Sequence, residues 1–168
     1  KIAAYPFTTL IPHLGVVQID EKVTYIVADI PGLIEGAHQG KGLGIEFLKN
    51  VKRCRLLVHL IDATEMRTVQ DDPIKNFQVI NHELTRFSKD LAKKPQIVVI
   101  NKSDLLSPEQ EKSIFKALKK EIGRKKRFVL YPHTISSATR KGIPELKTYL
   151  FQELQRMRDP SASPSSTS

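Results

Sequence analysis

Short apolar runs along the chain alternate with longer segments in which apolar residues recur every three or four positions. Three of the runs, residues 56–61, 96–100 and 128–131, predict fully buried β-strands. Two earlier runs, residues 14–20 and 23–29, predict a β-hairpin that is joined by a polar turn. Strands of this length and kind need helices to cover them, and the intervening segments supply the helical pattern.

Helical spacing predicts three helices. Their apolar stripes are Ile74, Phe77, Ile80, Leu84, Phe87 and Leu91; then Ile114, Leu118 and Ile122; then Ile143, Leu146, Leu150, Leu154 and Met157. Asp72-Pro73 begins the first helix, and Ser107 with Gln110 forms a capping pattern for the second. Alternating strands and helices predict an α/β fold, a three-layer sandwich with a mostly parallel sheet and one antiparallel hairpin edge strand. Ligands of such sheets bind beyond the carboxyl ends of the strands.

Composition favours a single globular domain. The 168 residues are 40% hydrophobic and 27% charged, which excludes a disordered chain. We expect one domain over residues 1–158 and a disordered tail, rich in Pro, Ser, Ala and Thr, over 159–168. No apolar run approaches the roughly 20 residues of a membrane span, so we expect no membrane partner. We also expect the protein to be a monomer. The single Cys54 excludes an internal disulfide and fits a reducing compartment, the cytoplasm or alternatively an organelle.

Residues 101–104, Asn-Lys-Ser-Asp, follow an apolar run and carry the most specific chemistry. The carboxylate of Asp104 can accept two parallel hydrogen bonds from the ring N–H and the exocyclic amine of guanine. Adenine lacks this donor pair, and leaving a buried charged acceptor unpaired costs about 3 kcal/mol, a discrimination of about a hundredfold. Asn101 would support the loop, and the stem of Lys102 would lie along the face of the base. The alternative is an ordinary polar turn between strand and helix.

Two further loops extend this pattern. Asp29 follows a strand in the order Asp29-Ile30-Pro31-Gly32, where a carboxylate suits Mg²⁺ and a glycine lets its N–H approach a terminal phosphate. A simple Pro-Gly turn is the alternative. Ser136-Ser137-Ala138 follows the last predicted strand and could present backbone N–H groups to the guanine carbonyl oxygen. Together the three loops predict a guanine-nucleotide site.

The chain resembles the Obg family of GTPases. The resemblance is carried by Tyr5-Pro6-Phe7-Thr8-Thr9-Leu10, by Asp29 to Ala37 (Asp-Ile-Pro-Gly-Leu-Ile-Glu-Gly-Ala) and by Gly40-Lys41-Gly42-Leu43-Gly44. It implies a P-loop GTPase fold that binds GTP and GDP with Mg²⁺, hydrolyses GTP slowly, and acts on assembly of the large ribosomal subunit. It also implies roles for single residues: Thr9 and Asp29 at the metal, Thr9, Asp29, Pro31 and Gly32 in the phosphate switches, and Asn101, Lys102, Asp104, Ser136, Ser137 and Ala138 around guanine.

One expected motif has no match. None of the eight glycines lies in a Gly-x-x-x-x-Gly-Lys-Ser/Thr sequence, the loop that cradles the phosphates in GTPases. We therefore expect a G domain without its first strand and phosphate-binding loop, with little or no catalysis by the isolated chain. Since the first strand would lie between the strands ending at Asp29 and Ile61, its absence would leave two strand edges unpaired and the fold poorly stable. A cooperative thermal transition with a high midpoint would count against this expectation.

No catalytic residue can be assigned. Leu33 stands where Ras-like enzymes carry a glutamine, and the polar Glu35 and His38 nearby are more readily explained as surface residues of a loop.

The chain is strongly basic. Its 27 Lys and Arg against 18 Asp and Glu give a net charge of +9. One basic cluster comprises Lys116, Lys119, Lys120 and residues 124–127, and another comprises Lys49, Lys52, Arg53 and Arg55. These clusters could neutralise phosphates of ribosomal RNA or could be solvated surface. A non-hydrolysing, RNA-binding module derived from a GTPase is therefore the alternative function.

Overall fold

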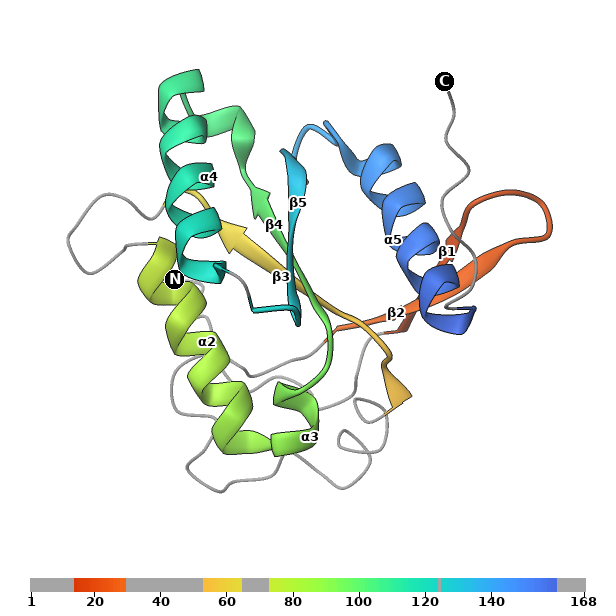
Figure 1. Ribbon diagram of the computed structural model, residues 1–168. Coiled ribbons are helices and arrows are strands. Elements are labelled where there is room, and N and C mark those ends of the chain that lie inside the picture. Colours follow the sequence, from red (N-terminus) through yellow and green to blue (C-terminus); the bar gives the residue numbers. More distant parts are fainter. Residues whose placement is uncertain (1–13, 30–52, 65–72, 124, 160–168) are drawn as a thin grey trace, which may run out of the picture.

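Two β-sheets are formed by the residues that the computed structural model describes, which are 14–29, 53–64, 73–123 and 125–159. β1 (Leu14–Gln18) and β2 (Thr24–Ala28) form an antiparallel hairpin. β3 (Leu57–Asp62), β4 (Gln96–Asn101) and β5 (Phe128–Thr134) form a parallel sheet in the order β3-β4-β5. The described helices are α2 (Pro73–Phe87), α3 (Lys89–Ala92), the 3₁₀ helix η1 (Ser103–Leu105), α4 (Pro108–Ile122) and α5 (Ile143–Arg158) (Figure 1).

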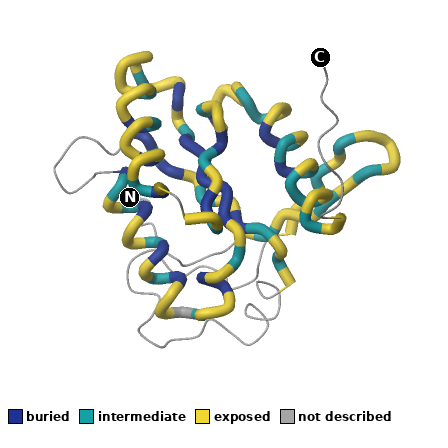
Figure 2. Tube along the Cα trace, viewed as in Figure 1, coloured by how far each residue is buried: buried dark blue, intermediate teal, exposed yellow. Residues whose placement is uncertain are grey.

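The central strand β4 has a hydrophobic core on each of its faces. Val98 and Ile100 belong to a core that includes Phe77 of α2 and Leu118 of α4. Ile97 and Val99 belong to a second core, which α5 completes. The helices accordingly lie on the two sides of the parallel sheet (Figure 1), and the buried residues concentrate in the strands between them (Figure 2). The predicted three-layer α/β architecture is confirmed.

The helices follow the predicted stripes with one difference. The capping box of Ser107 and Gln110 is present at the start of α4. The predicted first helix ends at Phe87, because Ser88 adopts an extended conformation (φ −157°, ψ 120°) and its side chain caps the short α3. α5 ends at Arg158, where the tail was predicted to begin, and residues 160–168 lie outside the described part. No described helix combines the length and apolar character of a membrane span.

Strand β3 is less buried than its apolar sequence predicts. Leu57 and Ile61 are 6% and 2% exposed, but Val58 and Leu60 are 40% and 50% exposed. The expectation of a fully buried strand is wrong here, because β3 is the outermost strand of the parallel sheet.

The hairpin forms a sheet of its own beside this edge. Among the described strands, none pairs with the outer edge of β3 or with the edge of β2 that is not bonded to β1. A cleft of about 640 Å³ has residues of both strands in its wall, including Ile26, Val27, Val58 and Leu60. The hydroxyl of Tyr25 in β2 donates to the carbonyl of Lys147 in α5 (3.2 Å), which ties the hairpin to the body. Among the described strands these two edges have no partner, whereas the missing first strand and the poor stability of the fold stay predictions.

Candidate nucleotide-binding site

The predicted base-reading residues follow parallel strands that end at one edge of the sheet. In the register of β3 and β4, Asp62 stands opposite Asn101, the last residue of each strand. β5 runs parallel to β4 and pairs with it as far as Thr134 opposite Ile100. The loops after β3, β4 and β5 therefore emerge side by side, as binding sites of open α/β sheets require.

Asn101 joins the loop after β4 to the loop after β5. Its side-chain oxygen Oδ1 accepts hydrogen bonds from the backbone N–H of Ser137 (3.0 Å) and from the Ser137 hydroxyl (3.1 Å). Two backbone bonds reinforce this junction: Ser103 N–H donates to the carbonyl of Ile135 (3.0 Å), and Ile135 N–H donates to that of Ile100 (2.8 Å). The structure therefore brings two of the three predicted loops into direct contact.

The turn after β5 is held from within. Ser136 is fully buried, its N–H donates to the carbonyl of Lys141 (3.0 Å), and its hydroxyl oxygen accepts from Thr139 N–H (3.1 Å). Gly142 closes the turn with φ +73°, and a Cβ at this position would lie 3.1 Å from the Cγ2 of Ile135. The hydrogen bonds of Ser136 hold the turn together, and Ser137 and Ala138 are exposed at its tip.

Asp104 lies in η1 with its side chain exposed. Lys102 adopts the left-handed conformation (φ 63°, ψ 34°) that turns the chain from β4 into η1. Within the described residues, no hydrogen bond or ion pair engages the Asp104 carboxylate. An exposed, unengaged carboxylate is available to accept the paired donors of a base. Ser103, between them, is buried, and its hydroxyl has no hydrogen-bond partner.

Asp62 belongs to the site and escaped the sequence prediction. Its carboxylate forms an ion pair with the ammonium group of Lys102, and its Oδ1 accepts from the N–H (3.0 Å) and hydroxyl (2.7 Å) of Thr64. Partial burial acts to raise the pKa of Asp62, but the hydrogen bonds from Lys102 and Thr64 outweigh it and lower the pKa. The available signal was its position, since an acidic residue directly after an apolar strand lies at the binding edge.

The predicted switch and metal residues are only partly visible. Asp29 is exposed directly after β2, and it lines the same cleft as Ser137. Its carboxylate is the hard oxygen donor that Mg²⁺ prefers, so this residue fits the predicted role. Thr9, Pro31 and Gly32 lie outside the described residues. Within the described part, no group of three or more His, Cys, Asp or Glu residues forms a metal cluster.

Comparison with known proteins gives concordant similarities. Residues 1–102 match the family model described as 50S ribosome-binding GTPase. The chain is similar to the GTPase Obg of Desulfosudis oleivorans (51% identity over 153 residues, 91% of this chain and 43% of the relative). The corresponding proteins of Persephonella marina and Aquifex aeolicus are 48% and 45% identical, with 95% of this chain and 44% of each relative covered. The chain thus spans 43% to 44% of the length of these relatives.

A solved structure supports the fold independently. The translation elongation factor SelB of Methanococcus maripaludis, in complex with the GTP analogue GppNHp, superposes with a TM-score of 0.52 over 95% of this chain and 30% of that protein. At 18% sequence identity this similarity concerns the fold alone.

Proposed function

Because the chain belongs to the 50S ribosome-binding GTPase family, and within it to the Obg type, we propose that the protein carrying it is a guanine-nucleotide switch. In this proposal the protein hydrolyses GTP slowly and acts in assembly of the large ribosomal subunit. The 168 residues supply the guanine-reading edge and the Asp29–Gly32 switch. The alternative of a non-hydrolysing RNA-binding module finds no support in the three relatives, which all carry the name GTPase.

The pair of hydrogen bonds from Ser137 to Asn101 carries the proposal. It holds the tip of the last loop against the loop that presents Asp104, so that acceptor and donor groups can face one ring. Asp104 would accept from the guanine ring N–H and amine. The N–H groups of Ser136 and Ser137 are already engaged, whereas no bond to Ala138 N–H is recorded within the described residues. Ala138 N–H is thus the natural donor to the guanine carbonyl oxygen.

The phosphate end is assigned by the same proposal. Thr9 and Asp29 would hold Mg²⁺, which when bound neutralises charge on the phosphates. Gly32 would offer its N–H to the terminal phosphate, with Pro31 shaping the approach. Because the 168 residues contain no match to the phosphate-binding loop, hydrolysis is proposed for a protein in which such a loop accompanies them. No general base is assigned.

Nucleotide titration tests the proposal. A fluorescent GDP analogue is titrated in Mg²⁺ against the longest product of the gene that encodes these residues and against the 168-residue chain. We expect the longer protein to bind GDP and to reject ADP by about a hundredfold, and to hydrolyse GTP slowly. We expect the 168-residue chain to bind GDP weakly. Equal affinity of the longer protein for GDP and ADP would overturn the proposal.

Sedimentation with purified large ribosomal subunits tests the partner. We expect the GTP-bound longer protein to co-sediment with the subunits more than the GDP-bound protein does. Co-sedimentation that is independent of the nucleotide would contradict a switch.

A further inference from the structure

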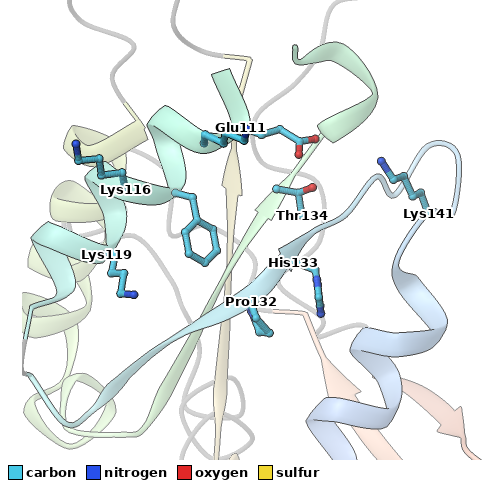
Figure 3. Close-up of a pocket in the computed structure, with 9 residues that line it drawn as sticks. Glu111, Lys116, Lys119, Pro132, His133, Thr134 and Lys141 are labelled. Carbon is cyan, nitrogen blue, oxygen red and sulfur yellow. The ribbon is translucent and has the colours of Figure 1, made fainter. Parts of the chain in front are cut away.

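A second cleft lies between α4 and β5, and at one end it reaches Lys141 in the turn that follows β5. Its volume is about 520 Å³, and it shares no lining residue with the cleft that contains Asp29 and Ser137. Figure 3 shows Lys116 and Lys119 on α4 and Lys141 on the opposite side, with Thr134 and Pro132 of β5 between them. The cleft is therefore bounded by α4, by β5 and by the turn that follows β5.

The cleft carries an excess of positive charge. Lys112, Lys116 and Lys119 follow one another at helical spacing along α4, and Lys141 adds a fourth ammonium group. Glu111 is the one acidic residue among those that line the cleft. The structure records no ion pair for any of the four lysines within the described residues. Since all four side chains are exposed, their charge is available to an outside partner.

Both walls are fixed by the fold. The opposite face of α4 buries Ile114, Leu118 and Ile122 in the core, so the helix cannot rotate its lysines away from the cleft. On the other side, the carbonyl of Lys141 accepts the hydrogen bond from buried Ser136. The fold therefore fixes the backbone positions of the lysines that line the cleft.

Flat and apolar groups lie among these charges. Phe115 is half-buried and packs partly against the core, and Pro132 and the exposed His133 belong to the lining as well. Ammonium groups suit phosphates, and exposed ring surfaces suit unstacked bases. An acidic peptide would also use the charges, and poly-glutamate is therefore included as a competitor in the test.

We propose that the α4–β5 cleft binds a single-stranded segment of RNA, with phosphates on the four lysines and bases against Phe115 and His133. The inference rests on the proposed function, in which ribosomal RNA is the partner, and it names the surface that meets it. Duplex RNA is a poorer fit, since its stacked bases are withheld from side chains.

Counterion release sets the expected size of the effect. For single strands, the logarithm of the binding constant falls with the logarithm of salt by about 0.7 for each phosphate neutralised. At 0.1 M salt this amounts to about fivefold in affinity per contact, and thus to about 25-fold for two contacts.

The test uses a charge-neutral double variant and a matched control. Lys116→Gln with Lys119→Gln removes two ammonium groups from the cleft. Lys89→Gln with Lys93→Gln removes two exposed ammonium groups that do not line the cleft, at the start of α3 and directly after its end. Helix α3 lies apart from α4 (Figure 1). A labelled single-stranded RNA of mixed sequence is titrated by fluorescence anisotropy at several salt concentrations, and circular dichroism checks that each variant folds.

We expect the cleft variant to lose about 25-fold in RNA affinity at 0.1 M salt and about 1.4 in salt slope, with the control close to wild type. Equal losses of RNA affinity in the two variants would show that binding depends on the general positive charge of the chain and not on the cleft. This result would overturn the proposal. Tighter binding of poly-glutamate or of duplex RNA than of the single strand would also overturn it. GDP titration of the longer protein with the same substitutions separates the two proposals, because loss of RNA binding with unchanged GDP affinity concerns the cleft alone.

Discussion

The contact between Asn101 and Ser137 can be tested by a double-mutant cycle. Asn101→Ala removes the acceptor of two hydrogen bonds, from the N–H of Ser137 and from its hydroxyl. Ser137→Ala removes only the hydroxyl bond. A neutral hydrogen bond contributes a net free energy of roughly 0.5–1.5 kcal/mol. Because Ser137 is exposed and water can replace part of what is lost, values at the lower end apply.

We therefore expect Asn101→Ala to lower the free energy of unfolding by about 1–2 kcal/mol and Ser137→Ala to lower it by about 0.5–1 kcal/mol. The double variant should cost less than the sum of the two, with a coupling energy of about 0.5–1 kcal/mol from the shared hydroxyl bond. Urea unfolding followed by circular dichroism measures all four proteins. Additive single costs, within about 0.3 kcal/mol, would show that the two side chains do not support each other.

The cycle also reports on binding. If the contact positions the rim of the guanine site, Asn101→Ala should weaken GDP binding by the longer protein more than Ser137→Ala does, because it frees the N–H of Ser137 as well. Equal GDP affinities of the two single variants and wild type would refute a role for this contact in the site.

Three further perturbations follow from the same edge of the sheet. Ser103→Ala removes a buried hydroxyl that has no partner, so urea unfolding should show equal or higher stability, and a loss of more than about 1 kcal/mol would reveal an unseen partner. Gly142→Ala places a Cβ at φ +73°, 3.1 Å from Ile135 Cγ2, and should destabilise by about 1–2 kcal/mol in the same assay. The lowered pKa of Asp62 means that its pairing with Lys102 stabilises the fold above the ordinary value of 3.8 and is lost as pH falls below it. Asp62→Asn should therefore cost at most about 1 kcal/mol near neutrality and should flatten the acid limb of stability against pH; an unchanged acid limb would contradict the pairing.

The order of helices and strands could be predicted because, along most of the chain, the spacing of the apolar residues agrees with which residues are buried. The inner positions of β4, Ile97 to Ile100, are all apolar and lie in the central strand of the sheet. In α4, Ser107 caps the helix about two turns before the first buried residue, Ile114. The break at Ser88 could not be foreseen, because Leu84 and Leu91 continue the helical spacing across it. A serine in such a position only raises the chance of a cap.

Parts of the site also could not be predicted from the local sequence pattern. An apolar run such as that of β3 predicts a buried strand whether the strand lies in the middle of a sheet or at its edge. The sequence therefore contained no indication that Val58 and Leu60 would be exposed. The ion pair of Lys102 with Asp62 joins residues that are distant in sequence, and the parallel register of β3 and β4 brings them together. The contact of Asn101 with Ser137 follows from the fold once the order of strands is known, which is why motif order predicted the neighbourhood but no bond within it.

Exchange of Asp104 for asparagine tests most directly whether this edge reads guanine. Asn presents an amide N–H₂ where the carboxylate had an acceptor, and xanthine carries a carbonyl where guanine carries its amine. For the longer protein, we predict that Asp104→Asn lowers GDP affinity by about a hundredfold and raises affinity for xanthosine diphosphate above that for GDP. An Asp104→Asn protein that binds GDP as tightly as wild type would contradict the account.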